Sequence, residues 1–131
     1  MRLLIDTHCW LWWFLAPEKL NNVAKEAMAV STSVLFFSAV SSWEIAIKHR
    51  LGKLKLPEPP VTYIPKKLEK HGMTPLPMHH RHALGTTELP LHHRDPFDRL
   101  LISQARTDNL QLVTADPQLR QYDVDILWAA H

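Results

Sequence analysis

Apolar residues in this chain form short continuous runs, separated by longer stretches in which they recur with a helical period. Continuous runs are typical of strands buried on both faces, and recurrence every three to four residues is typical of helices. Strands are predicted at residues 2–5, 34–37, 73–76, 110–114 and 125–127. Helices are predicted at residues 9–16, from Asn21 or Asn22 to 30, from Ser41 to near Gly52, and at 62–71, 80–86 and 96–108. This alternation predicts an α/β fold with a parallel sheet of four to five strands.

Residues with capping or stopping preferences mark several of the predicted helix ends. Thr7 is expected to cap the first helix, and Pro17 is expected to end it. Ser41 and Glu44 match the capping-box pattern, in which a serine and a glutamate three residues later satisfy each other's backbone groups. The third helix is therefore expected to begin at Ser41.

Length and composition correspond to one globular domain. The 131 residues are 46% hydrophobic and 21% charged, and domains usually contain about 100–200 residues. A single domain over residues 1–131 is therefore expected. The one cysteine, Cys9, excludes an internal disulfide and any zinc site built from cysteines, and its expected place is in the core. A net charge of +2 argues against a general nucleic-acid coat.

No segment has the pattern of a membrane span or of a cleaved leader. The apolar run at residues 9–16 is too short to cross a bilayer. The first residues also lack a charged leader followed by a small-residue cleavage site. A soluble cytoplasmic protein is expected.

Five acids fall where predicted strands end or predicted helices begin. Asp6 and Asp116 follow the first and fourth strands, while Glu44, Asp95 and Asp98 lie in the first turns of helices. All five positions belong to the carboxyl edge of the expected sheet, where ligands bind in folds of this class. For any one of these acids alone, helix capping is the better explanation, because acids are favoured at helix N-termini.

Two of the acids are predicted to turn toward the interior on apolar helix faces. These faces carry Asp98 with Leu101, Ile102 and Ala105, and Glu44 with Ile47 and Leu51. An inward carboxylate is costly unless a positive charge or a hydrogen bond compensates it. A hard divalent ion, Mg²⁺ or Mn²⁺, is the natural compensation. Such an ion, held by acids in a chain without a phosphate-binding loop, indicates phosphodiester hydrolysis.

Four segments together resemble a known family. They read Leu-Leu-Ile-Asp-Thr-His at 3–8, Ser-Ser-Trp-Glu-Ile-Ala-Ile-Lys at 41–48, Asp-Pro-Phe-Asp-Arg-Leu-Leu at 95–101 and Leu-Val-Thr-Ala-Asp at 112–116. In this order and spacing the chain resembles the PIN-domain family and, within it, the VapC-type toxins of bacterial type II toxin–antitoxin pairs. The resemblance extends from about Leu3 to Leu127.

The resemblance implies a three-layer α/β/α fold and an endoribonuclease site that uses Mg²⁺ or Mn²⁺. The acidic positions of the family correspond to Asp6, Glu44, Asp98 and Asp116. On this basis Asp6 and Asp98 are expected to bind the ion directly, and Glu44 to bind it or to orient the attacking water. Asp116 is expected to act as a ligand, often through water. The implied partners are RNA, a cognate VapB-like antitoxin and a second copy of the chain, with operator DNA reached only through the antitoxin.

Other residues near these acids are expected to support them. Asp95 is either a helix cap or a further ligand, and Thr114 resembles the hydroxyl position of the family, which orients a ligand or water. Thr7 lies beside the first acid. Arg99, like Arg94, is placed to contact RNA phosphate, the antitoxin or a neighbouring acid.

Other interpretations were weighed against this one. A PIN scaffold without activity, acting as a protein- or RNA-binding module, is the main alternative. A receiver-type phosphoacceptor domain needs an acid after the third strand, and residues 73–78 contain none. A haloacid-dehalogenase phosphatase needs a second aspartate two residues after Asp6, where His8 stands. The histidine pairs at 79–80 and 92–93 are expected to be loop residues, because neighbours in sequence point to different faces.

Overall fold

The protein is described by a computed structural model that covers residues 1–131. Its five strands form one sheet in the order β3-β2-β1-β4-β5, and every neighbouring pair is parallel. The strands are β1 (Arg2–Ile5), β2 (Val34–Ser38), β3 (Thr74–Leu76), β4 (Gln111–Thr114) and β5 (Ile126–Trp128). The predicted parallel α/β sheet is thus confirmed, with the larger of the two expected strand numbers.

Six helices connect the strands. They are α1 (Thr7–Leu15), α2 (Asn22–Ala29), α3 (Ala39–Arg50), α4 (Pro60–Lys70), α5 (His80–Gly85) and α6 (Pro96–Thr107), with short 3₁₀ turns at Pro17–Lys19, Thr86–Glu88 and Pro117–Gln121. None of them has both the length and the apolar character needed to cross a membrane.

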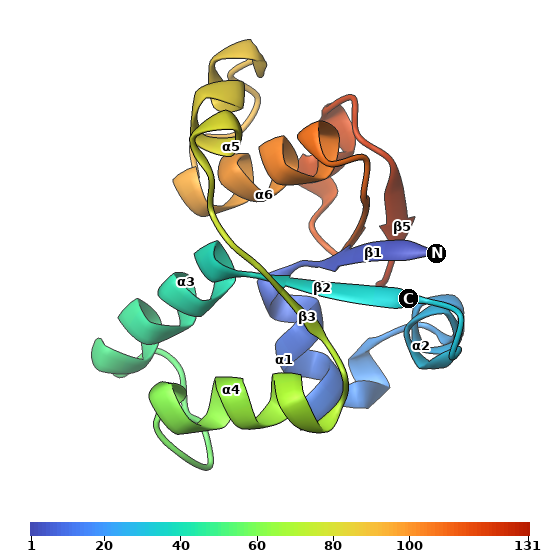
Figure 1. Ribbon diagram of the computed structural model, residues 1–131, viewed down its shortest axis with the longest axis vertical. Coiled ribbons are helices and arrows are strands. Elements are labelled where there is room, and N and C mark those ends of the chain that lie inside the picture. The colour runs from blue at the N-terminus through green and yellow to red at the C-terminus, as the bar shows by residue number, and fades with distance from the viewer.

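The helices form two layers on the two faces of the sheet (Figure 1). Helices α1, α2 and α4 cover one face, where Leu3 and Ile5 of β1 join their apolar side chains. Helices α5 and α6 lie on the other side, and the buried face of α6 packs there against Leu4 and Leu112. Alternate residues of β1 therefore enter opposite cores, as expected for a strand buried on both faces. The three-layer α/β/α architecture is confirmed.

An aromatic cluster fills the core under α1. The Trp10 side chain is fully buried, stacks on Phe37 at 4.4 Å between ring centroids, and meets Phe14 and Tyr63 edge to face. Its indole N–H points to the sulfur of Met73 at 3.2 Å. Cys9 is buried in the same core, as predicted.

The chain reverses direction within the sheet between β1 and β4. It runs from the central β1 outward to β2 and β3, then returns to β4 on the other side of β1. The carboxyl ends of β1 and β4 therefore flank the topological switch point, where α/β sheets bind ligands. The segments after these two strands carry Asp6 and Asp116.

Two helix starts differ from the prediction. Asp6, rather than Thr7, caps α1, because its carboxylate accepts the Thr7 N–H at 2.8 Å. Helix α3 begins at Ala39 with Ser38 as its cap, so the expected capping box at Ser41 and Glu44 does not form. Ser38 has the same capping chemistry as Ser41, and the end of β2 decides between them.

The inward face of α3 also differs from the expected one. Glu44 is buried as predicted, but Leu51 is 62% exposed, and the fully buried apolar residue of this turn is Ile45. On the same helix, Trp43 is 58% exposed, and its ring packs edge to face on Phe97. The apolar period of a helix gives its stripe, but docking decides which side is covered.

Candidate active site

Asp6 lies at the centre of the switch point and is held by both neighbouring elements. Its Oδ1 accepts the Thr7 N–H, and its Oδ2 accepts a hydrogen bond from Thr114 Oγ1 at the end of β4, at 2.7 Å. Only 3% of Asp6 is exposed. Burial raises the pKa of this carboxyl above its ordinary value, the two hydrogen bonds and His8 oppose the rise, and the charge of Glu44 adds to it.

Glu44 enters the same region from α3. Its Oε2 accepts a hydrogen bond from Lys48 Nζ at 2.5 Å, one turn later on the helix. Its Oε1 is buried and has no hydrogen-bond partner. A buried carboxylate oxygen without a partner is costly, so this atom marks a place where the folded chain lacks a positive charge or a donor.

Asp98 is brought to the site by the first turn of α6. Burial raises the pKa of its carboxyl to about 7; the charges of Asp6, Asp95 and Glu44 add to this rise, and a hydrogen bond from His93 opposes it. Asp95 caps the helix, since its Oδ1 accepts the N–H groups of Phe97 and Asp98 at 2.9 and 3.3 Å. Of the two roles expected for Asp95, helix cap or ligand, the Oδ1 atom has the role of cap.

Asp116 completes the set from the segment after β4. Its Oδ1 accepts the Gln118 N–H and caps the following 3₁₀ turn, and its own N–H reaches Thr114 Oγ1 at 3.2 Å. Together with Asp6, His8 and Trp12 it lines an open pocket of about 300 Å³. The hydroxyl of Thr114 thus links two of the acids.

Ser41 and Thr7 connect the two helices behind Asp6. The Thr7 hydroxyl donates to Ser41 Oγ at 2.8 Å, and both side chains are buried. This contact ties the first turn of α1 to the first turn of α3, the elements that begin beside Asp6 and that carry Glu44. Thr7 supports the site in this indirect way.

His93 was not predicted to belong to the site, and the structure brings it there. Its Nε2 lies 2.7 Å from Asp98 Oδ2, and side-chain donor atoms of His93, Asp98 and Asp116 lie within 4.8 Å of one another. His93 lies in a loop as predicted, but the loop before α6 brings its ring against Asp98, a contact that the sequence did not predict. The available signal was its position two residues before the Asp95 cap.

Arg99 binds the backbone of the chain itself and forms no ion pair with a neighbouring acid. Its guanidinium donates to the backbone carbonyls of Thr86, Leu89, Pro90 and His93, and to the hydroxyl of Tyr122. These carbonyls belong to the loop that ends at His93. Arg99 therefore holds this loop in place, because the carbonyls of an irregular segment need donors, and the expected pairing with a neighbouring acid does not form.

Comparison with known proteins identifies the family. The sequence pattern described as PIN domain matches residues 3–125. The chain belongs to the PIN-domain family. The resemblance inferred from the four sequence segments is confirmed, including its VapC-type character, because the relatives of this PIN domain carry that name.

Two curated relatives of this PIN domain are ribonucleases of Mycobacterium tuberculosis. Ribonuclease VapC16 is 43% identical over 69 residues, which are 53% of this chain and 48% of the relative, so that match spans about half of each protein. Ribonuclease VapC22 is 28% identical over 124 residues, which are 92% of this chain and 91% of the relative.

Solved structures support the same fold. VapBC2 from Rickettsia felis, bound to a DNA fragment from its promoter, gives a TM-score of 0.73 at 15% identity and covers 98% of this chain and 99% of its own. DNA-bound VapBC from Salmonella typhimurium gives 0.72 at 14% identity, with 97% of both chains covered. VapBC-1 from nontypeable Haemophilus influenzae gives 0.69 at 17% identity, with 98% of both covered.

The residues of this PIN domain fit a divalent cation. Donor atoms of Asp98, Asp116 and His93 lie within 4.8 Å of one another, and carboxylate oxygens are the ligands that hard divalent ions prefer. Beyond the effect of burial, the charge of Glu44 raises the pKa of Asp6, and the charges of Asp6 and Glu44 raise the pKa of Asp98, as like charges brought together do. A cation would relieve this repulsion and would give the Glu44 Oε1 atom the partner that it lacks.

Proposed function

We propose that this PIN domain is an endoribonuclease that depends on Mg²⁺ or Mn²⁺ and acts as the toxin of a toxin–antitoxin pair. It is an enzyme of the hydrolase class and cleaves phosphodiester bonds of RNA. The observation that carries the proposal is the convergence of four buried or half-buried acids at the switch point, with an unpaired oxygen on Glu44. The names of the two curated relatives, both ribonucleases, support RNA as the substrate.

Asp6, Glu44, Asp98 and Asp116 would hold the cation. When bound, such an ion polarises a phosphoryl oxygen and lowers the pKa of a water molecule. The chain's part is to hold the oxygens in place. Thr7 and Thr114 fix both oxygens of Asp6, and the capping bond from the Gln118 N–H fixes the side chain of Asp116, which lines the same pocket. Fixed ligands need little reorganisation when substrate arrives.

Glu44 and Lys48 act as a pair in this proposal. Lys48 holds Oε2 and leaves Oε1 free, so Oε1 is the oxygen that Glu44 would offer to the cation while its orientation is maintained. The ammonium of Lys48 also lies close enough to Asp95 and Asp98 for their charges to raise its pKa, although burial opposes this. Lys48 therefore stays charged at neutral pH and keeps Glu44 oriented.

The proposed partners follow from the proteins that share this fold. The structural neighbours are VapBC assemblies, two of them bound to DNA. By analogy, a VapB-like antitoxin neutralises this chain and carries it to operator DNA, and two copies of the chain form a homodimer in the cytoplasm. Co-purification with the product of a small neighbouring reading frame tests the first point, and light scattering against the 15.2 kDa chain mass tests the second.

The activity is tested with Asp6→Asn, which preserves the shape of the side chain. Purified protein is incubated with total RNA and either Mg²⁺ or Mn²⁺, with and without chelator, and the new RNA ends are mapped. The wild type should cleave only with metal, and the variant should lose at least about a hundredfold in rate, because a positioned ligand is lost. Asp123→Asn is the matched control, since Asp123 is fully exposed and should cleave normally.

Two outcomes would oppose the proposal. Full cleavage by Asp6→Asn, in a preparation free of other nucleases, would show that the acids are not the site. No cleavage by the wild type, together with no gain in melting temperature on adding either ion, would favour the inactive binding scaffold instead.

A further inference from the structure

The loop that carries His93 is held in place by a dedicated set of hydrogen bonds. Arg99 donates to the carbonyls of Pro90 at 2.9 Å and His93 at 3.4 Å, and further along to those of Thr86 and Leu89. The His93 N–H donates to Tyr122 Oη at 2.8 Å. The N–H and the carbonyl of His93 are therefore both hydrogen-bonded, which fixes the position of its Cα and Cβ atoms.

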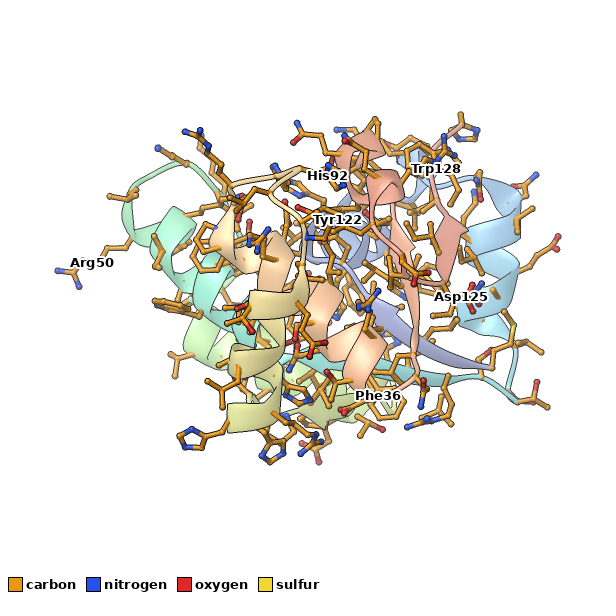
Figure 2. All side chains as sticks on the ribbon, turned by 90° about the horizontal axis from the view of Figure 1, so that it is seen from above. Phe36, Arg50, His92, Tyr122, Asp125 and Trp128 are labelled. Carbon is orange, nitrogen blue, oxygen red and sulfur yellow. The ribbon has the colours of Figure 1, made fainter.

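The side chains of His92 and His93, neighbours in this loop, have different surroundings. His92 packs its ring against Tyr122, with 5.3 Å between ring centroids, and the two are seen close together in Figure 2. His93 instead turns its ring toward α6, where its side chain is only 17% exposed and Nε2 meets Asp98 Oδ2. The backbone anchor thus presents one imidazole nitrogen to the acids.

We propose that His93 is a nitrogen ligand of the cation, which makes the donor set mixed and favours a later transition ion such as Co²⁺ over Mg²⁺. This inference rests on the metal site of the proposed function. Donor atoms of His93, Asp98 and Asp116 lie within 4.8 Å of one another. Independently, Oε1 of Glu44 is buried without a hydrogen-bond partner, and the charge of Glu44 reaches Asp98, so a positive charge bound here would compensate it.

The selectivity follows from ligand chemistry. Mg²⁺ prefers oxygen ligands and gives up its bound water molecules reluctantly. Later divalent ions gain more from an imidazole nitrogen, following the Irving–Williams order. His93 is also preorganised by Arg99 and Tyr122, so little ordering is lost when it binds an ion. A site made only of carboxylates would discriminate less between Co²⁺ and Mg²⁺.

A positioning role is the competing explanation for the same geometry. If His93 Nε2 carries a proton and donates it to Asp98 Oδ2, it orients that carboxylate and touches no ion. Its loss would then weaken all divalent ions by a similar factor, because each would lose the same orientation of Asp98. The two explanations therefore differ in their dependence on the metal.

The test compares His93→Gln with the wild type in calorimetric titrations of the metal-free chain with Co²⁺ and with Mg²⁺. Glutamine can still donate an N–H to Asp98 but lacks the imidazole nitrogen. The Co²⁺ affinity should fall at least about tenfold, while the Mg²⁺ affinity should change by less than about threefold. His92→Gln, in the same loop, is the matched control and should leave both affinities unchanged.

Pulsed electron paramagnetic resonance of bound Mn²⁺ provides a second readout that does not depend on activity. Coupling to an imidazole ¹⁴N should be present in the wild type and in His92→Gln, and absent in His93→Gln. Persistence of the coupling in His93→Gln, an equal loss of affinity for both ions, or no loss for either would each overturn the inference and leave the carboxylate site standing. A wild type that binds neither ion would overturn the proposed metal site as well.

Discussion

Single carboxylates in this protein serve two purposes at once. Asp6 and Asp116 each cap a helical turn with Oδ1 and contribute a second oxygen to the crevice, and Asp95 also caps with Oδ1. From the sequence alone, helix capping and a role in the site are alternative explanations for each of these acids. A carboxylate has two oxygens with about four acceptor positions, so the same residue satisfies both.

The raised pKa of Asp98 makes the stability of the metal-free protein depend on pH. The folded chain raises the pKa of Asp98 from its ordinary 3.8 to about 7, so the folded state binds that proton more tightly than the unfolded state. The stability that Asp98 contributes is present below about pH 4 and is lost as pH rises through 7. Asp98→Asn should therefore raise the melting temperature of the metal-free protein at pH 8 relative to the wild type, with a much smaller effect at pH 4.5.

The comparison of variant and wild type isolates Asp98 from other groups. His71, whose pKa is lowered by burial and by Lys67 and Lys70, changes stability in the opposite direction as pH rises. It is present in both proteins and cancels from the difference. Equal melting temperatures for the two proteins at pH 8, measured with chelator present, would contradict the raised pKa.

Among the elements, α1 is the one on which the larger core depends. Trp10 contacts residues from α1, β2 and α4, and it is the largest side chain that is fully buried. Its neighbours on the helix, Trp12 and Trp13, are only partly buried against the same core. The apolar character of α1 therefore reflects mainly its central place under the sheet.

Trp10→Ala should lower the free energy of unfolding by about 3–5 kcal/mol, because it removes a fully buried aromatic and leaves a cavity. The same substitution at Trp43 should cost less than about 1.5 kcal/mol, since that ring is 58% exposed and has one aromatic contact. Urea unfolding followed by far-UV circular dichroism measures both. Similar losses at the two positions would contradict this packing.

Helices α5 and α6 approach each other closely at Gly85. A Cβ atom there would lie 2.5 Å from Ser103 Oγ, and that hydroxyl donates to the His82 carbonyl at 2.5 Å. The backbone of Gly85 is right-handed helical, so close packing alone explains the glycine. A larger residue must displace Ser103 and break its hydrogen bond.

A double-mutant cycle tests this contact. Gly85→Ala should cost about 1–3 kcal/mol through overpacking, and Ser103→Ala about 1 kcal/mol through the lost hydrogen bond. The double variant should be about as stable as Ser103→Ala alone, because the clash disappears with the hydroxyl. Additive losses would mean that the two residues do not interact.

For the whole molecule, the arrangement of the sheet gathers negative charge at one place. Acids from four separate segments meet beside β1 and β4, although the chain as a whole has a net charge of +2. Burial and mutual repulsion raise the pKa of Asp6 and of Asp98. The metal-free fold therefore carries an unfavourable electrostatic term that a cation should remove.

Metal should accordingly stabilise the entire fold. A ligand at a hundred times its dissociation constant adds about 2.7 kcal/mol to the free energy of unfolding, so the melting temperature should rise with Mn²⁺ and fall again with chelator. Asp6→Asn should show a much smaller rise, and Asp123→Asn the full rise. Differential scanning fluorimetry at constant ionic strength measures this, with a Na⁺ salt as the control for nonspecific screening.

The sequence by itself determined the fold class, the position of nearly every strand and helix, and the placement of Asp6 and Asp116 at strand ends. These features follow from local periodicity and from the general rule that parallel strands end at one edge. They do not depend on how any helix is rotated, which is why chain order and hydrophobic pattern were enough.

Only the tertiary structure decided the rotation of α3, the contact of His93 with Asp98 and the turn of Arg99 toward the loop. Ser38 and Ser41 are chemically equivalent caps, so the end of β2 had to choose between them. The loop before α6 is irregular and has no period to read; its path is set by the donors of Arg99 and Tyr122. Such contacts join residues whose pairing depends on the packing of distant elements, and the local pattern of hydrophobic residues carries no information about them.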